Sequence, residues 1–150
     1  MFTIKSILVP TDFSSYAHNA LTHAVDLAKK YQAKISLFHV IDEHVQQCVV
    51  DYCLSDTVIR QYEEESLKTS NQKLQEEITR ISGITNGVEI IPYAKRGIPY
   101  DEIIKLQEEK NIDLIVIASH GKTGILKNLI GSVSEKVVRT AKCPVMVIRS

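Results

Sequence analysis

The residues best suited to chemistry lie in one tract near the C-terminus that mixes glycine, hydroxyl and basic side chains. It runs from residue 119 to residue 132 with the sequence SHGKTGILKNLIGS. Glycines let backbone N–H groups approach phosphate oxygens, and Gly131 leads into a helix whose free N–H groups and dipole attract an anion. The side chains available to such an anion are those of Lys122, Lys127, Ser132 and Ser134. The tract predicts a phosphate-binding loop; the alternative is that each glycine serves only a turn or a helix cap.

Two well-known phosphate loops do not fit this tract. Gly121-Lys122-Thr123 resembles the end of a Walker A loop, but the leading glycine of that motif would fall at Val116, inside an apolar run. A dinucleotide-binding fingerprint would need glycine at Ser119, and it normally follows the first strand of the domain. The tract therefore indicates a phosphate loop of another type.

Other candidate chemistry is weaker. His44, Cys48, Asp51 and Cys53 are zinc-ligand types, but their spacing matches no recognised finger. The carboxylates at residues 63–65 are interpreted as the solvated face of a charged helix. The sequence shows no set of nucleophile, base and orienting residue, so we expect no catalytic residue and no metal site. If a bound phosphate compound turns over, we expect a slow reaction that relies on positioning with Mg²⁺.

The composition sets limits on partners and location. The chain has 150 residues, enough for one domain over residues 1–150, with 18 basic and 18 acidic side chains. Because the net charge is zero, we expect neither nucleic acid nor an anionic membrane as partner. There is no signal-peptide pattern and no apolar run of membrane-spanning length, and the three cysteines are too few for a disulfide framework. The cytoplasm is the expected location.

Short apolar runs alternate with helical patterns along the chain. Hydrophobic periodicity predicts strands at 4–10, 35–41, 88–93, 113–118 and 143–148, with helices beginning near Ser14 or Ser15, Thr57, Pro99 and Ser132. Pro92 favours an edge position for the third strand, and Ser132 to Glu135 has the form of a capping box. This order predicts a doubly wound α/β fold with a five-stranded parallel sheet. Its ligand site lies beyond the carboxyl ends of the strands.

The chain resembles the universal stress protein family over almost its whole length. The resemblance rests on the spacing from Gly121 over nine residues to Gly131-Ser132, on ILVPTDFS from residue 7 and on CPVMVI from residue 143. It implies a Rossmann-like sandwich, similar to the adenine nucleotide alpha hydrolases, with strand order 3-2-1-4-5. The family pattern has another glycine where this chain has Ala118. A methyl group there narrows the loop and disfavours positive φ, so we expect weakened rather than abolished nucleotide binding.

The resemblance also implies ligands, partners and roles. The ligand is an adenine nucleotide, ATP or AMP or ADP, with Mg²⁺; the protein acts in stress response as a homodimer through its C-terminal edge strand, with an unknown protein partner. The alternative is a dimeric interaction protein that has lost nucleotide affinity. Pro10, Thr11 and Asp12 border the adenosine, and Val40 lines the adenine pocket. Asp12 makes polar contacts with the adenosine or, as the alternative, serves only as a helix cap or turn residue. The ribose and phosphates are surrounded by Ala118, Gly121, Gly131, Ser132, Val133 and Ser134, with His120 and Lys122 as neighbours that either contact phosphate or belong only to the loop.

Overall fold

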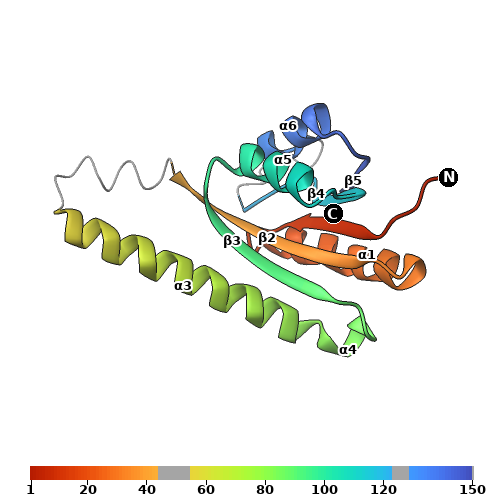
Figure 1. The fold of residues 1–150 in the computed structure, drawn as a ribbon, viewed down its shortest axis with the longest axis horizontal. Helices are drawn as coiled ribbons and strands as arrows, with labels where there is room; N and C mark the ends of the chain where they lie inside the picture. The colour runs from red at the N-terminus through yellow and green to blue at the C-terminus, as the bar shows by residue number, and fades with distance from the viewer. Residues whose placement is uncertain (44–54, 123–128, 150) are drawn as a thin grey trace.

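The computed structural model describes residues 1–43, 55–122 and 129–149. Five parallel strands form one sheet in the order β3-β2-β1-β4-β5, which confirms the predicted fold class (Figure 1). The strands are β1 (Ser6–Pro10), β2 (Lys34–Asp42), β3 (Ile90–Gly97), β4 (Leu114–Ala118) and β5 (Val145–Ile148). The helices are α1 (Ser15–Tyr31), α3 (Asp56–Arg80), α4 (Ser82–Thr85), α5 (Pro99–Glu109) and α6 (Ser132–Thr140).

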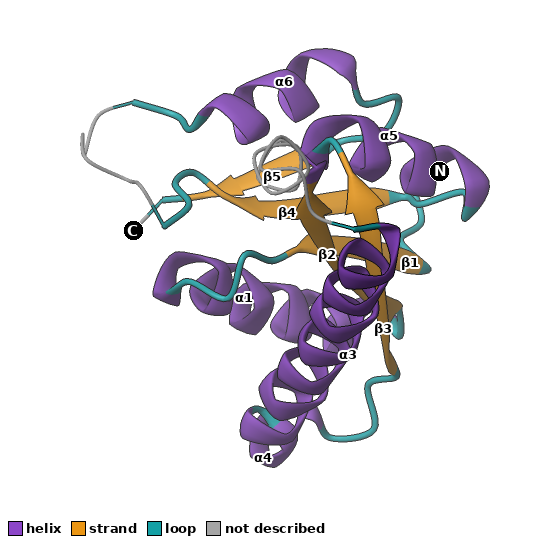
Figure 2. Ribbon diagram, turned by 90° about the vertical axis from the view of Figure 1, so that its left-hand side faces the viewer, coloured by secondary structure: helices purple, strands orange, loops and turns teal. Residues whose placement is uncertain are grey.

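Helices cover both faces of the sheet (Figure 2). Alternate strand residues point to opposite faces, so Val9 packs in the hydrophobic cluster under α1 and α3 while Leu8 packs in the one under α5 and α6. All five residues of β4 are buried, as its continuous apolar run predicts. The core thus fixes the carboxyl ends of β1 and β4 side by side, because β1 pairs with β4 directly.

Helix α1 begins where the sequence suggested. Ser14 is its N-cap, and the hydroxyl oxygen accepts a hydrogen bond from the backbone N–H of Ala17 at 3.2 Å. Ala20, Ala24 and Ala28 are fully buried. Small side chains at helical spacing bring the helix close to the sheet, so the start of α1 is held firmly beside the end of β1.

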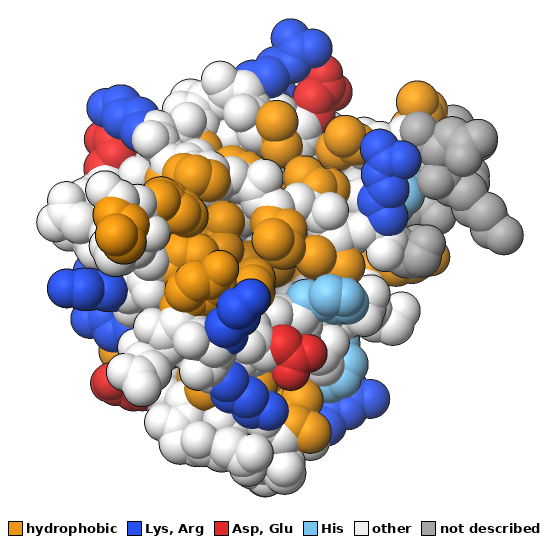
Figure 3. All heavy atoms as spheres, turned by 90° about the vertical axis from the view of Figure 1, so that its right-hand side faces the viewer, with side chains coloured by type: hydrophobic (Ala, Val, Ile, Leu, Met, Phe, Trp, Pro, Cys, Tyr) orange, Lys and Arg blue, Asp and Glu red, His pale blue; other side chains and the backbone are white. Residues whose placement is uncertain are grey.

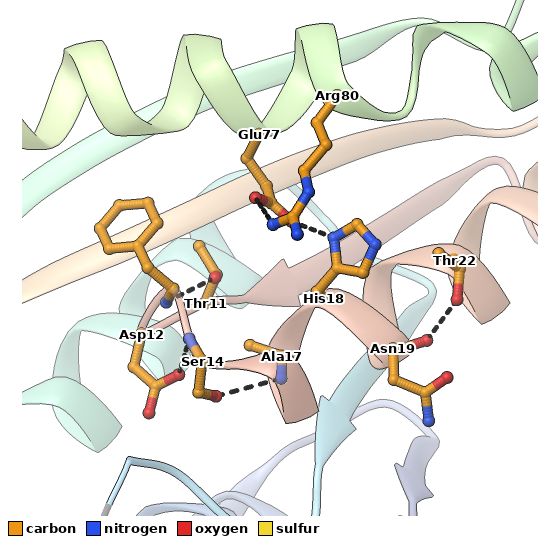
Figure 4. Close-up of polar contacts among 10 residues, drawn as sticks. Thr11, Asp12, Ser14, Ala17, His18, Asn19, Thr22, Glu77 and Arg80 are labelled. Carbon is orange, nitrogen blue, oxygen red and sulfur yellow. Dashed lines mark hydrogen bonds and ion pairs between the residues drawn. The ribbon is translucent and has the colours of Figure 1, made fainter.

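Helix α3 is long and mostly polar, and polar contacts help to hold it in place. Glu77 pairs with His18 of α1 and with Arg80, whose Nη1 lies 3.7 Å from Glu77 Oε2 (Figure 4). Near the other end, Glu63 Oε2 lies 2.7 Å from Arg96 Nη1 of β3. The prediction that Glu63 belongs to a solvated face is therefore wrong, because it is half-buried against β3; Glu64 and Glu65 are exposed as predicted.

The predicted bounds of the third strand and the predicted capping box of the last helix are wrong. Strand β3 begins later and runs longer than the predicted range 88–93, because Ile35 through Asp42 of β2 all pair with it; Pro92 does lie on an edge strand. The capping box does not form. The N-cap of α6 is Gly131, Ser132 is already helical, and no side chain of the described residues caps this helix.

The surface opposite the carboxyl ends of β1 and β2 carries hydrophobic side chains gathered in its middle, with both basic and acidic side chains around them (Figure 3). Exposed large hydrophobic residues of the chain include Phe2, Val138 and Met146. Within the described residues, no helix has the length and hydropathy needed to cross a membrane.

Candidate functional site

A cavity of about 320 Å³ opens at the carboxyl ends of the strands. The twelve residues that the family resemblance assigned to the ligand site all contribute to its wall. They are Pro10, Thr11, Asp12, Val40, Ala118, His120, Gly121, Lys122, Gly131, Ser132, Val133 and Ser134. This volume falls at the lower end of the roughly 300–1,000 Å³ typical of small-molecule sites.

The cavity is also lined by five residues that the sequence analysis did not assign to ligand binding: Ala17, Phe38, Pro99, Ile103 and Ile117. All five are apolar and make one side of the cavity hydrophobic. Residues two apart on a strand point to the same face, so the assignment of Val40 to the site could have led to Phe38. Ile117 could have been suggested by its neighbour Ala118. Pro99 and Ile103 are four residues apart at the start of α5, a spacing that puts both on one face of the helix.

The backbone of β2 extends past the end of β1 at this cavity. Strand β1 ends at Pro10, and among the described residues the last backbone-to-backbone hydrogen bond between the two segments runs 2.8 Å from Thr11 N–H to the carbonyl oxygen of Phe38. Alternate residues of a strand direct their N–H and C=O groups toward the same neighbour, so those of Val40 face the side that β1 has left. Val40 thereby presents one donor and one acceptor next to the hydrophobic wall.

The turn from β1 to α1 is tightly hydrogen-bonded (Figure 4). Phe13 N–H donates to Thr11 Oγ1 and Ser14 N–H donates to Asp12 Oδ1, both at 3.0 Å. Phe13 has φ of 65°, which is uncommon for a large non-glycine side chain. Asp12 Oδ2 accepts from the backbone N–H of Lys122 at 2.9 Å. Asp12 therefore caps this turn and also contacts the segment that follows β4.

The start of α6 lies against the end of β4. Gly131 N–H donates to the carbonyl oxygen of Ser119 at 2.6 Å, and a Cβ at residue 131 would lie 3.3 Å from that oxygen. Ser134 Oγ donates to the carbonyl oxygen of Ala118 at 2.7 Å. The N–H groups of the first turn of α6 are thus held at the cavity, with positive dipole charge and without a side-chain cap among the described residues.

Ala118 does not strain the backbone. It is the last residue of β4, pairs with Ile148 of β5, and is 6% exposed. The described non-glycine residues with positive φ are Phe13, Gln32, Asn86 and Asn111. The expectation that alanine at 118 opposes a required positive φ is therefore wrong, because the strand conformation accepts a methyl group. The methyl group does form part of the cavity wall.

Two histidines lie near the cavity. His39 Nδ1 is 2.8 Å from the carbonyl oxygen of Thr11, and its ring centroid is 4.4 Å from that of Phe13. Burial lowers the pKa of His39, and the ammonium groups of Lys122 and Lys73 lower it further against the opposing effect of Thr11 and Asp12. His120 Nδ1 is 2.7 Å from Ser119 Oγ. Through these contacts His39 supports the turn between β1 and α1, whereas His120 contributes to the cavity wall.

Residues 1–43, 55–122 and 129–149 contain no group of three or more histidine, cysteine, aspartate or glutamate side chains placed to hold a metal ion. The four residues of the alternative zinc site, His44, Cys48, Asp51 and Cys53, lie outside the described residues. Lys127, the second lysine of the predicted phosphate loop, lies outside them as well.

The fold and the cavity define a doubly wound α/β protein with a ligand-sized site at the point where the strand order reverses. The family model of the universal stress protein family matches residues 3–149. The chain belongs to the universal stress protein family.

Individual relatives match over most of their length. Universal stress protein MJ0531 of Methanocaldococcus jannaschii is 34% identical over 150 residues, which cover 97% of this chain and 82% of the relative. Universal stress protein YxiE of Bacillus subtilis is 32% identical over 152 residues, covering 97% and 99%. The solved structure of MJ0577, also from Methanocaldococcus jannaschii, superposes with a TM-score of 0.83 at 30% identity and covers 99% of this chain and 97% of that one.

Two structural neighbours contain adenine nucleotides. A universal stress protein in complex with cAMP has a TM-score of 0.67 at 22% identity, with 98% of both chains covered. The universal stress protein of Archaeoglobus fulgidus in complex with dAMP has a TM-score of 0.63 at 20% identity, covering 99% of this chain and all of that one. At these identities the likeness to this chain is one of fold.

Proposed function

We propose that the cavity at the carboxyl ends of the strands binds an adenine nucleotide, ATP or its relatives AMP and ADP. The observation that carries this proposal is the placement of two different surfaces in one cavity. Among the described residues, no backbone hydrogen bond joins Val40 to the segment after β1, and Val40 lies beside a hydrophobic wall. The start of α6, which no described side chain caps, forms another part of the same cavity wall. A nucleotide has one part for each surface, an aromatic base and an anionic phosphate.

The base would lie on the hydrophobic side. Phe38, Ile103 and Ile117 offer apolar contact, and burying a base there gains free energy in proportion to the area removed from water. Adenine presents an amine donor beside a ring-nitrogen acceptor, which matches the carbonyl and N–H of Val40. Guanine presents the opposite pair at the same edge, so it would leave these groups unsatisfied. The site is therefore expected to prefer adenine.

The phosphates would lie at the start of α6. The N–H groups of Ser132, Val133 and Ser134 belong to the first turn of this helix, where partial positive charge favours an anion. Lys122 adds a full positive charge at the cavity wall. Mg²⁺ would neutralise further phosphate charge when a polyphosphate is bound.

In this proposal the protein is a nucleotide-responsive module of the stress response rather than an enzyme. The relatives solved with cAMP and dAMP support an adenine ligand, since they have the same fold. The predicted homodimer and cytoplasmic location belong to the same proposal, as does a protein partner whose affinity changes when nucleotide binds.

Equilibrium titration with a fluorescent ATP analogue and Mg²⁺ tests the proposal. We expect a saturable signal that unlabelled ATP or AMP displaces. A signal that does not saturate at millimolar nucleotide would remove this function and leave the dimeric interaction protein as the better account.

A further inference from the structure

The carboxylate of Asp12 joins two loops that lie far apart in the sequence. Its Oδ1 accepts from Ser14 N–H at 3.0 Å and its Oδ2 accepts from Lys122 N–H at 2.9 Å. We call this pair of hydrogen bonds the Asp12 clasp. Residues 12 and 122 are 110 positions apart, so the clasp ties the turn after β1 to the segment after β4.

The same carboxylate limits the space beside Gly121. A Cβ added at residue 121 would lie 2.7 Å from Asp12 Oδ2, closer than real Cβ contacts allow. The described glycines with positive φ are Gly87 and Gly97, so the backbone of Gly121 has a conformation that alanine can adopt. Of the described atoms, the contact that opposes a side chain at 121 is therefore the Asp12 oxygen, 2.7 Å away, and not the backbone conformation.

The turn that carries Asp12 is fixed without a ligand. Phe13 is held at φ of 65° by the hydrogen bond from its N–H to Thr11 Oγ1 and by the contact of its ring with His39. His39 in turn binds the carbonyl oxygen of Thr11 at 2.8 Å. Asp12 is therefore presented to Lys122 by a rigid support, and it sets the position of the second loop.

We propose that Asp12 acts as a positioning residue, which fixes Gly121 and Lys122 along the phosphate side of the cavity, rather than through the polar contacts with adenosine that the family resemblance implies. The proposal deepens the proposed function and rests on it for the identity of the ligand. Charge alone predicts the opposite effect, because a carboxylate near phosphates repels them. Removing Asp12 should therefore weaken AMP binding if Asp12 positions the loop, and strengthen it if charge repulsion alone acts.

Separate titrations with adenosine and with AMP distinguish positioning from direct contact. In Asp12→Ala and Asp12→Asn we expect AMP to bind about tenfold more weakly, while adenosine affinity stays within about twofold, as expected for loss of a hydrogen bond to a charged acceptor. Asp26→Ala removes an exposed carboxylate of α1 and serves as the charge-matched control. Equal losses for both ligands would mean that Asp12 contacts the adenosine. Tighter or unchanged AMP binding would overturn the proposal as well.

A double-mutant cycle tests the link between residues 12 and 121. Gly121→Ala should weaken AMP binding about tenfold in the otherwise unchanged protein, because the methyl group displaces the clasp. In the Asp12→Ala background the clashing oxygen is gone, so the same change should cost less than about threefold. Equal costs in the two backgrounds would show that Gly121 is needed for a reason unrelated to Asp12.

Amide hydrogen exchange tests the clasp without any ligand. The Lys122 N–H should exchange more slowly in the unchanged protein than in Asp12→Ala, whereas the amide of Leu74 in the core should exchange at the same rate in both. Equal exchange at Lys122 would overturn the clasp. If the protein bound no nucleotide but Lys122 stayed protected by Asp12, the proposed function alone would fail.

Discussion

Ser134 Oγ donates a hydrogen bond to the carbonyl oxygen of Ala118 at 2.7 Å, and both residues are buried. The bond joins the first turn of α6 to the last residue of β4. It holds the N–H groups of α6 at the cavity, and it explains why a serine at this position serves the fold as well as the site.

Ser134→Ala should lower the free energy of unfolding by about 1–3 kcal/mol, because the buried carbonyl oxygen of Ala118 loses its side-chain donor. Urea denaturation of the two proteins measures the difference. Ser132→Ala is the matched control, since Ser132 is exposed in the same helical turn and should change stability by less than about 0.5 kcal/mol. Equal effects of the two changes would contradict the structural role given to Ser134.

Gly131→Val should weaken adenine-nucleotide affinity about tenfold and leave the protein folded. A Cβ at residue 131 lies 3.3 Å from the carbonyl oxygen of Ser119, so the start of α6 must shift away from the phosphates. Calorimetric titration and a thermal melt check the two parts of this prediction. Gly83→Val is the control, because an added Cβ meets no described atom within 4 Å at that position. Unchanged affinity in Gly131→Val would place the phosphates elsewhere.

Stability should decrease as the pH falls from 7 to 5 because of His39. Burial lowers the pKa of His39 in the folded protein, so the unfolded chain binds the proton more readily than the folded one. Stability is therefore fully present above the unfolded pKa of about 6.5 and is lost as the pH falls toward the lower folded value. His39→Asn should show a smaller loss over this range in denaturant titrations, whereas the exposed His23→Asn should behave like the unchanged protein. Parallel pH profiles for all three would contradict this assignment.

The edge of β5 should form a homodimer. Within the part of the chain that the structure describes, β5 is the last strand of the sheet and has no strand on its outer side, and Met146 of this strand is 39% exposed. An apolar edge strand is a surface that proteins usually cover. Light scattering after gel filtration should give twice the chain mass, and Met146→Lys should shift the protein toward the monomer. Met146→Leu is the control that keeps the apolar surface, and a monomer in the unchanged protein would contradict the prediction.

Much of the fold follows from local patterns in the sequence. The buried run of β4 and the alanine spacing of α1 predict these elements because burial and period decide them locally. Strand β3 is misplaced by the sequence because its length is set by pairing with β2. Glu63 is misjudged because its partner Arg96 lies on another element.

The candidate site, like the fold, has parts that the sequence predicts and parts that it does not. The glycine loop identifies the part of the cavity near α6, and the end of β1 identifies the part near Asp12. The clasp between Asp12 and Lys122 has no sequence signal, since it joins residues 110 positions apart. The sequence does not predict the positive φ of Phe13 either, because large side chains rarely adopt it. Contacts with His39 and Thr11 hold it.

Competition between adenine and guanine nucleotides tests the central claim most directly. With a fluorescent ATP analogue bound, AMP and ATP should displace it at least about tenfold more effectively than GMP and GTP, because guanine would leave the backbone groups of Val40 unsatisfied. Equal displacement by the two bases would contradict recognition at the edge of β2. A failure of every adenine nucleotide to displace the analogue would contradict the nucleotide site itself.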